Sequence, residues 1–278
     1  ARLIAECNAL PGDPGFITAT YCEDARFFTP ANGARIDAIR AHIGDLDLEP
    51  DLEAVLLTAL LEGADRVDST TGVQMAYLKQ WAPRALRPLE LRMPDVLPRA
   101  AAGRGEARQA DALDAVRGAN VDLLYLDPPY NQHSYLGNYH IWETITLGDR
   151  PETYGVAKKR IDCRERKSDF NSRPKIAGAM RSLLASATAR VLVVSLSDEG
   201  YLAREELEAM LAERWAFGAM AFDYKRYVGA QIGVHNPKGE RVGAPGRLRN
   251  TEFLYVASKD AALVEAAVGK AQLSPASV

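Results

Sequence analysis

Five consecutive residues combine a carboxylate, two prolines, an aromatic ring and an amide: Asp127, Pro128, Pro129, Tyr130 and Asn131. Prolines fix φ and remove backbone donors, so the Pro128 carbonyl cannot be absorbed into a strand ladder. A carboxylate and an adjacent carbonyl at fixed separation suit a planar amino group with two hydrogens, and Tyr130 offers a flat face for a heterocycle. The tetrad Asp127–Tyr130 therefore predicts a site for the exocyclic amine of a nucleobase. The simpler alternative is an ordinary turn, with Asp127 as a cap and Tyr130 in the core.

The tetrad directly follows one of the apolar runs that predict a sheet. The runs at 121–126 and 190–197 are typical of strands buried on both faces of a parallel sheet. Two more strand-like stretches, 217–228 and 251–258, flank a loop rich in Gly and Pro and predict a long hairpin. We expect helices between the strands at 137–147, 175–188 and 202–213. In such an open α/β sheet, ligands bind at the carboxyl ends of strands, where Asp127 lies.

The first hundred residues have a mainly helical pattern of apolar residues. Apolar positions recur at helical spacing in three stretches, 34–45, 50–67 and 69–81. A stretch rich in Pro and Gly, 88–107, follows and is the best candidate for a domain seam. We therefore expect a helical segment over residues 1–100 and a catalytic domain over residues 101–278.

Composition excludes several classes of protein. The chain has 278 residues, of which 47% are hydrophobic and 26% charged, as in a globular protein. No apolar run is long enough to span a membrane, and the first residues do not read as a secretory signal. The cysteines Cys7, Cys22 and Cys163 lie far apart and the four histidines are scattered, which argues against a metal site. We expect free thiols and a cytoplasmic protein without metal.

Charge is distributed unevenly along the chain. The net charge is −3 overall and −5 over residues 1–100, but +4 over 158–167 and +5 over 224–249. Each basic run could be a solvated face, yet two such runs favour a polyanion as partner. The candidates for phosphate contacts in the second run are Lys225, Arg226, Arg247 and Arg249.

These motifs resemble the Dam-like adenine-specific (N6) DNA methyltransferases, whose amino-methylation motif is DPPY. The similarity continues through DPPYNQHSYLGNYHIWETI, VVSLSDEG, YKRY and NTEFLYVASK, and the front segments NALPGDPGFITATY and RFFTPANGARIDAIR resemble one branch of the family. The resemblance implies a Rossmann-like S-adenosylmethionine-dependent methyltransferase sheet with a C-terminal antiparallel hairpin and a helical insert. It also implies that residues 1–100 hold the target-recognition region.

The resemblance implies direct methyl transfer to a flipped adenine in double-stranded DNA. The adenine stacks on Tyr130 beside Asn131 and donates its amino hydrogens to Asp127 and the Pro128 carbonyl. Asp111 with Ala112 matches the position that binds the adenine of S-adenosylmethionine, and Asp127 borders the same cofactor. Asp111 could also act as a helix N-cap.

The sequence departs from the family at its start. The FxGxG loop of the family and the Asn-Asp turn after it do not occur here, so the first strands of the domain are expected to be missing, cleaved or supplied by another chain. We expect a role in restriction-modification or a related defence system, with a restriction endonuclease as a candidate partner. A catalytically silent DNA-binding subunit and N4-cytosine methylation remain alternatives, although the latter usually has Ser in place of Asp127.

Overall fold

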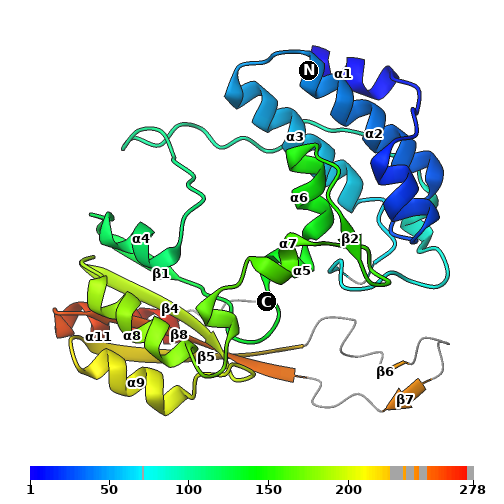
Figure 1. Cartoon of the computed structure of the whole chain (residues 1–278). Helices are drawn as coiled ribbons and strands as arrows, with labels where there is room; N and C mark the ends of the chain where they lie inside the picture. The colour runs from blue at the N-terminus through cyan, green and yellow to red at the C-terminus, as the bar shows by residue number, and fades with distance from the viewer. Residues whose placement is uncertain (71, 226–233, 236–240, 244–248, 274–278) are drawn as a thin grey trace. The chain divides into compact units, whose positions relative to one another are not determined.

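The computed structural model describes residues 1–70, 72–225, 234–235, 241–243 and 249–273 (Figure 1). The chain forms two compact units, each built from two separate stretches. The helical unit comprises Ala1–Gly105 with Tyr135–Arg166, and the sheet unit comprises Glu106–Ser134 with Lys167–Val278. The chain thus passes between the units three times. Residues 135–166, which the sequence grouped with the catalytic domain, pack with the helical unit.

The helical unit has one apolar core, formed mainly by two long helices. Its elements are α1 (Arg2–Ala9), η1 (Thr18–Glu23), α2 (Pro30–Asp45), α3 (Pro50–Asp65), η2 (Pro83–Leu86), α5 (Tyr135–Asn138), α6 (His140–Leu147), β2 (Thr153–Tyr154), β3 (Lys159–Arg160) and α7 (Asp162–Glu165). Helix α2 begins where the Thr29 side chain accepts from the amide of Asn32, with Pro30 in its first turn. Its buried Ile36, Ile39 and Ile43 recur at three and four residues, as predicted, and form one apolar stripe.

The helix expected over residues 69–81 does not form in the described part of that segment. Its backbone is bonded elsewhere: the Ser69 amide donates to the carbonyl of Phe27, and the Gln74 amide donates to the carbonyl of Asn138. The Gln74 side chain in turn accepts from the amide of Ile141 at 2.7 Å. Tertiary hydrogen bonds therefore override a local spacing that favoured a helix.

The basic run at 158–167 is largely engaged inside the helical unit. Arg160 is buried and forms ion pairs with Asp149 at 2.6 Å and with Asp162 at 3.1 Å. Those carboxylates raise the pKa of the guanidinium, which keeps its charge. Lys158 pairs with Asp24 at 2.8 Å and Arg166 with Glu143 at 3.1 Å. This run therefore supports the polyanion prediction less than its sequence suggested.

The sheet unit contains a four-stranded mixed sheet. Its elements are α4 (Ala112–Arg117), β1 (Leu123–Leu126), η3 (Asp169–Asn171), α8 (Ile176–Ser186), β4 (Val191–Ser197), α9 (Arg204–Ala212), β5 (Ala216–Lys225), β6 (Val234–His235), β7 (Arg241–Gly243), β8 (Arg249–Ser258) and α11 (Ala261–Leu273). The strand order is β1-β4-β8-β5, with β1 and β4 parallel and β8 antiparallel to both of its neighbours. The predicted α/β sheet with a long C-terminal antiparallel strand pair is confirmed.

The two faces of this sheet differ. Leu126, Val194 and Tyr255 point to the face covered by α8 and α9, where they form a buried core with residues of both helices (Figure 1). On the other face, α11 packs against β5 and β8. The expectation that β1 is buried on both faces is wrong, because Leu123 and Tyr125 are 55% and 52% exposed. Strand β1 lies at the edge of the described sheet and so lacks a neighbouring strand on one side.

None of the helices in the described ranges combines the length and the apolar character needed to cross a bilayer.

Close packing inside the helical unit makes Gly33 a sensitive position. A Cβ atom there would lie 2.3 Å from the Cys22 sulfur and 3.2 Å from the Thr18 Cα. We expect Gly33→Ala to lower the free energy of unfolding of this unit by about 1–3 kcal/mol in urea denaturation. Gly44→Ala in the same helix is the control, since its nearest atom lies 3.4 Å away and alanine favours helix. Equal stability of the two variants would contradict this packing.

Candidate active site

The tetrad stands where the sheet brings two parallel strands to an end. Strand β1 ends at Leu126, which lies opposite Val194 of β4 in the parallel register. Asp127 is the next residue, so it follows the carboxyl end of β1 beside Ser195 of β4. Pro128 and Pro129 are half-buried and carry no N–H group, so neither can extend the ladder. This is the sheet edge where open α/β folds bind ligands.

The backbone of the tetrad is docked on the turn that follows β4. The amide of Tyr201 donates to the carbonyl of Tyr130 at 2.7 Å. Gly200 permits this approach, because a Cβ atom there would lie 3.1 Å from the Ser197 carbonyl oxygen and 3.3 Å from the Tyr130 Cβ. The Tyr201 hydroxyl also donates to the side-chain oxygen of Gln132. Residues 197–201 (SDEGY) thus support the tetrad through a hydrogen bond and close packing.

A second contact holds the loop after the tetrad. The Asn171 side-chain amide, from η3, donates to the Asn131 carbonyl at 2.7 Å and to the His133 carbonyl at 3.1 Å. Asn131 also accepts through its side chain from the amide of His133 at 2.9 Å. The loop leaves the sheet unit after Ser134, and the chain returns at Lys167. Asn171 therefore links the segment that leaves the sheet unit to the segment that re-enters it.

The electrostatics of the tetrad leave the ring neutral. Burial, and after it the nearby Tyr224 and Glu252, raise the pKa of Tyr130 to about 12, while a hydrogen bond with Ser197 acts in the opposite direction. Tyr130 therefore keeps its proton at neutral pH and presents an uncharged face. Asp127 is exposed, yet the protein around it desolvates the carboxyl enough to raise its pKa above the ordinary value of 3.8.

A polar row beside the tetrad was missed by the sequence reasoning. The Glu252 carboxylate on β8 accepts from the Ser195 hydroxyl and from the Tyr224 hydroxyl, the latter at 3.4 Å. Asn250, two residues earlier on the same strand, donates to Glu199 at 2.9 Å. Alternation in NTEFLYVAS puts Asn250 and Glu252 on one face, away from Phe253 and Tyr255. Two polar residues in an otherwise apolar strand were the available signal.

The predicted cofactor residues Asp111 and Ala112 lie in the sheet unit. They take no part in the described hydrogen bonds that hold the tetrad. Asp111 is the N-cap of α4, where its side chain accepts from the amide of Leu113 at 2.9 Å. Ala112 is the first residue of that helix, and both residues are exposed. No described hydrogen bond joins either of them to Asp127. The alternative reading of Asp111 as a cap is thus observed, and a cofactor role stays a prediction.

Two of the four basic residues predicted to contact phosphates are described, and both lie where β5 ends and β8 begins. Lys225 of β5 stands opposite Arg249 of β8, and both are exposed. Arg249 also pairs with Asp223 at 2.7 Å. Arg226 and Arg247 lie outside the described residues.

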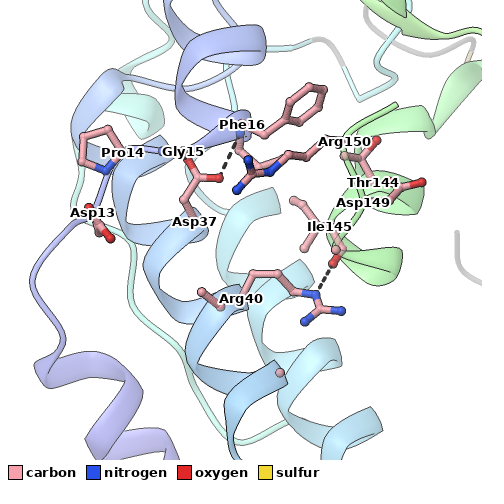
Figure 2. A pocket seen from close by; sticks show the side chains of 14 residues that line it. Asp13, Pro14, Gly15, Phe16, Asp37, Arg40, Thr144, Ile145, Asp149 and Arg150 are labelled. Atoms are coloured by element: carbon pink, nitrogen blue, oxygen red, sulfur yellow. Dashed lines mark hydrogen bonds between the residues drawn. The ribbon is translucent and has the colours of Figure 1, made fainter. Parts of the chain in front are cut away.

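The helical unit has a pocket of about 310 Å³, but protein groups already use most of its charges (Figure 2). Asp37 accepts from the amides of Gly15, Ile17 and Thr18 at 2.8–2.9 Å. Arg40 donates to the carbonyl of Ile145 at 2.7 Å, at the end of α6, as Figure 2 shows. The pocket therefore supports the fold of this unit, and the strand ends of the sheet unit are the better candidate for chemistry.

The described residues contain no cluster of His, Cys, Asp and Glu that could bind a metal ion. The three cysteines are buried, and no disulfide joins them.

We expect Asn171→Asp to release the loop after the tetrad, because a carboxylate would face the carbonyls of Asn131 and His133 in place of a donor. Hydrogen exchange at the amides of residues 131–134 should accelerate roughly tenfold, the equivalent of one lost hydrogen bond. Ser172→Ala is the control, since the bonds of Ser172 come from its backbone. Unchanged exchange in Asn171→Asp would show that this side chain does not hold the loop.

The comparisons with known proteins point to one family. The family model for D12 class N6 adenine-specific DNA methyltransferases matches residues 5–210. The chain is 38% identical over 205 residues to the type II methyltransferase M.FokI of Planomicrobium okeanokoites, which covers 70% of this chain and 31% of that protein. It is 30% identical over 234 residues to the type II methyltransferase M.NlaIII of Neisseria lactamica, covering 81% and 69%.

A third relative is the modification methylase StsI of Streptococcus sanguinis, 29% identical over 194 residues, which covers 68% of this chain. The chain spans 31% of the length of M.FokI and 29% of the length of StsI. No solved structure shows significant similarity to the chain. Because the family model matches most of its residues, including the tetrad, the chain belongs to the D12 class of N6 adenine-specific DNA methyltransferases.

Proposed function

We propose that the protein methylates the exocyclic amino group of adenine in double-stranded DNA, with S-adenosylmethionine as methyl donor. This proposal is supported mainly by the position of the tetrad at the end of β1. There the tetrad packs against the turn at Gly200, and the Tyr201 amide donates to the Tyr130 carbonyl. These contacts hold the backbone of Tyr130 against the turn after β4, and the two fixed φ angles of Pro128 and Pro129 limit how far Asp127 can move relative to Tyr130. Fixed acceptors around a flat ring suit an amino-bearing base, and family membership identifies the base as adenine.

The chemistry follows from these three groups. A flipped adenine stacks on the neutral ring of Tyr130 and donates one amino hydrogen to the Asp127 carboxylate and the other to the Pro128 carbonyl. Both bonds draw the nitrogen lone pair out of conjugation with the ring and direct it. Pro129 stiffens the turn, and Asn131 lies at the edge of the site. Positioning and fixed dipoles thus supply the rate enhancement, without a covalent intermediate.

The residues present fit part of a cofactor site. Methyltransferases of this family use S-adenosylmethionine, which supplies an electrophilic methyl group when bound. The Asp111 carboxylate is exposed and uses one oxygen, Oδ1, as the cap of α4, so its second oxygen can accept from an amino group. We propose that Asp111 and Ala112 hold the adenine end of the cofactor and that Asp127 borders its methyl end.

DNA binding is proposed for both units. The exposed Lys225 and Arg249 at the end of the long strand pair, with Arg226 and Arg247 beyond the described residues, are suited to phosphates. The helical unit is proposed to read the target sequence. The relatives named modification methylase or type II methyltransferase support a place in restriction-modification, with a restriction endonuclease as functional partner.

Asp127→Ala should lower methyl transfer from labelled cofactor to duplex DNA by at least about a hundredfold in the full-length protein, because a fixed acceptor of the amino group is lost. Asp122→Ala is the control, since Asp122 is an exposed aspartate at the opposite end of the same strand. Transfer at the wild-type rate by Asp127→Ala would remove the tetrad from the reaction. Methyl transfer by the wild type to cytosine in place of adenine would support the alternative function, N4-cytosine methylation.

DNA affinity should fall steeply with salt if the long strand pair contacts phosphates. In Lys225→Ala, the slope of log affinity against log salt should decrease by about one for all DNA sequences alike, as measured by fluorescence anisotropy. Lys175→Ala is the control, because Lys175 pairs with Asp169 at 2.9 Å on the surface beside α8. An equal slope in wild type and Lys225→Ala would exclude this lysine from the interface.

A further inference from the structure

Glu252 shares one face of the sheet with Asp127 at the strand ends. Leu126 and Val194 lie opposite each other and point into the core, so the next residues, Asp127 and Ser195, point to the opposite face. Glu252 lies opposite Ser197, two residues after Ser195 on the same strand, and so points to the face that Asp127 also occupies. Asp127 and Glu252 thus share one face of the sheet, and the charge of Glu252 also acts on Tyr130.

The surroundings of Glu252 combine hydrogen-bond donors, which favour its charged form, with burial, which opposes it. It is half-buried, and the hydroxyls of Ser195 and Tyr224 both donate to it. Burial raises its pKa most, the Ser195 hydroxyl opposes this, and the charges of Asp127 and Asp198 raise it further. The charge of Glu252 in turn raises the pKa of Tyr224, after burial, and contributes to the raised pKa of Tyr130.

The charged and titratable groups around Glu252 come from every neighbouring element. Asp127 approaches from the end of β1, Asp198 from the end of β4 and Tyr224 from β5. Tyr130 approaches from the tetrad, and Glu199 acts on that same ring. The carboxylates among these groups repel one another, so the ionisation of each raises the pKa of its neighbours.

We propose that Glu252 is a positioning residue for methyl transfer, whose negative charge makes Asp127 a stronger proton acceptor. This inference rests on the proposed function. As the methyl group moves, its bond to the sulfonium sulfur breaks and a bond to the amino nitrogen forms, which leaves an extra positive charge on that nitrogen. The nitrogen then loses one of its two hydrogens as a proton to Asp127. The charge of Asp127 raises the pKa of Glu252, and because such coupling is reciprocal an ionised Glu252 increases the affinity of Asp127 for that proton.

Glu252→Gln separates charge from shape, since glutamine can still accept from Ser195 and bond to Tyr224. In the full-length protein, the acid limb of the pH profile of kcat/KM should move to lower pH by about one unit. At neutral pH, kcat should fall about threefold because Asp127 becomes a weaker base. Glu252→Asp, which retains the charge, should restore the acid limb of the wild type.

Glu208→Gln is the matched control, because Glu208 also accepts from a tyrosine of β8, Tyr255 at 3.4 Å, but from helix α9 on the other face of the sheet. Its loss of one negative charge should leave the acid limb in place. An acid limb that moves equally in both glutamine variants would show a general charge effect and overturn the inference.

A titration without substrate tests the coupling directly. The carboxyl carbon of Asp127, observed by NMR and assigned with Asp127→Asn, should titrate in two steps in the wild type, because it senses the ionisation of Glu252. In Glu252→Gln a single step at lower pH is expected. A single, ordinary step in the wild type would overturn the inference even in an active enzyme. Absence of adenine methylation by the wild type would instead contradict the proposed function, and the titration would still decide the coupling.

Discussion

The parallel pairing of β1 with β4 is the constraint on which the site depends. It places the carboxyl ends of two strands side by side, so that Asp127 and the turn after Ser197 emerge together. The hydrogen bond from the Tyr201 amide to the Tyr130 carbonyl then locks the tetrad to that turn, and Gly200 is the residue that leaves room for it. Without this pairing the tetrad would be an ordinary Pro-Pro turn, because its acceptors would have no fixed orientation.

The loop after the tetrad is also held where the chain leaves the sheet unit. The chain leaves the sheet unit only a few residues after Tyr130 and returns just before Asn171. The Asn171 side chain bonds to the carbonyls of Asn131 and His133, so the exit and the return are tied together inside the sheet unit. The helical unit has its own core and its own buried ion pairs around Arg160. Each unit therefore has its own core, as the proposed division of recognition and catalysis between them requires.

The sequence predicted the parts whose information is local. An apolar run followed by the tetrad located the end of β1, and the strand-like stretch 251–258 after a loop rich in Gly and Pro located β8. The segment 69–81 had helical spacing, but its Gln74 bonds to α5 and α6, which no local pattern records. Residues 137–147 had a helical pattern that could pack on either core. Glu252 was overlooked because its meaning depends on Asp127 and Ser195, which are far away in sequence and adjacent only across the sheet.

The tetrad is proposed to hold adenine while a methyl group is transferred to its amino nitrogen. The most direct test of this proposal is to express the full-length gene in a host without DNA methylation and to sequence the modified bases of the host DNA. N6-methyladenine is expected at one fixed sequence motif, and none is expected when the tetrad is disrupted. Unmodified adenine throughout, or N4-methylcytosine in its place, would contradict it.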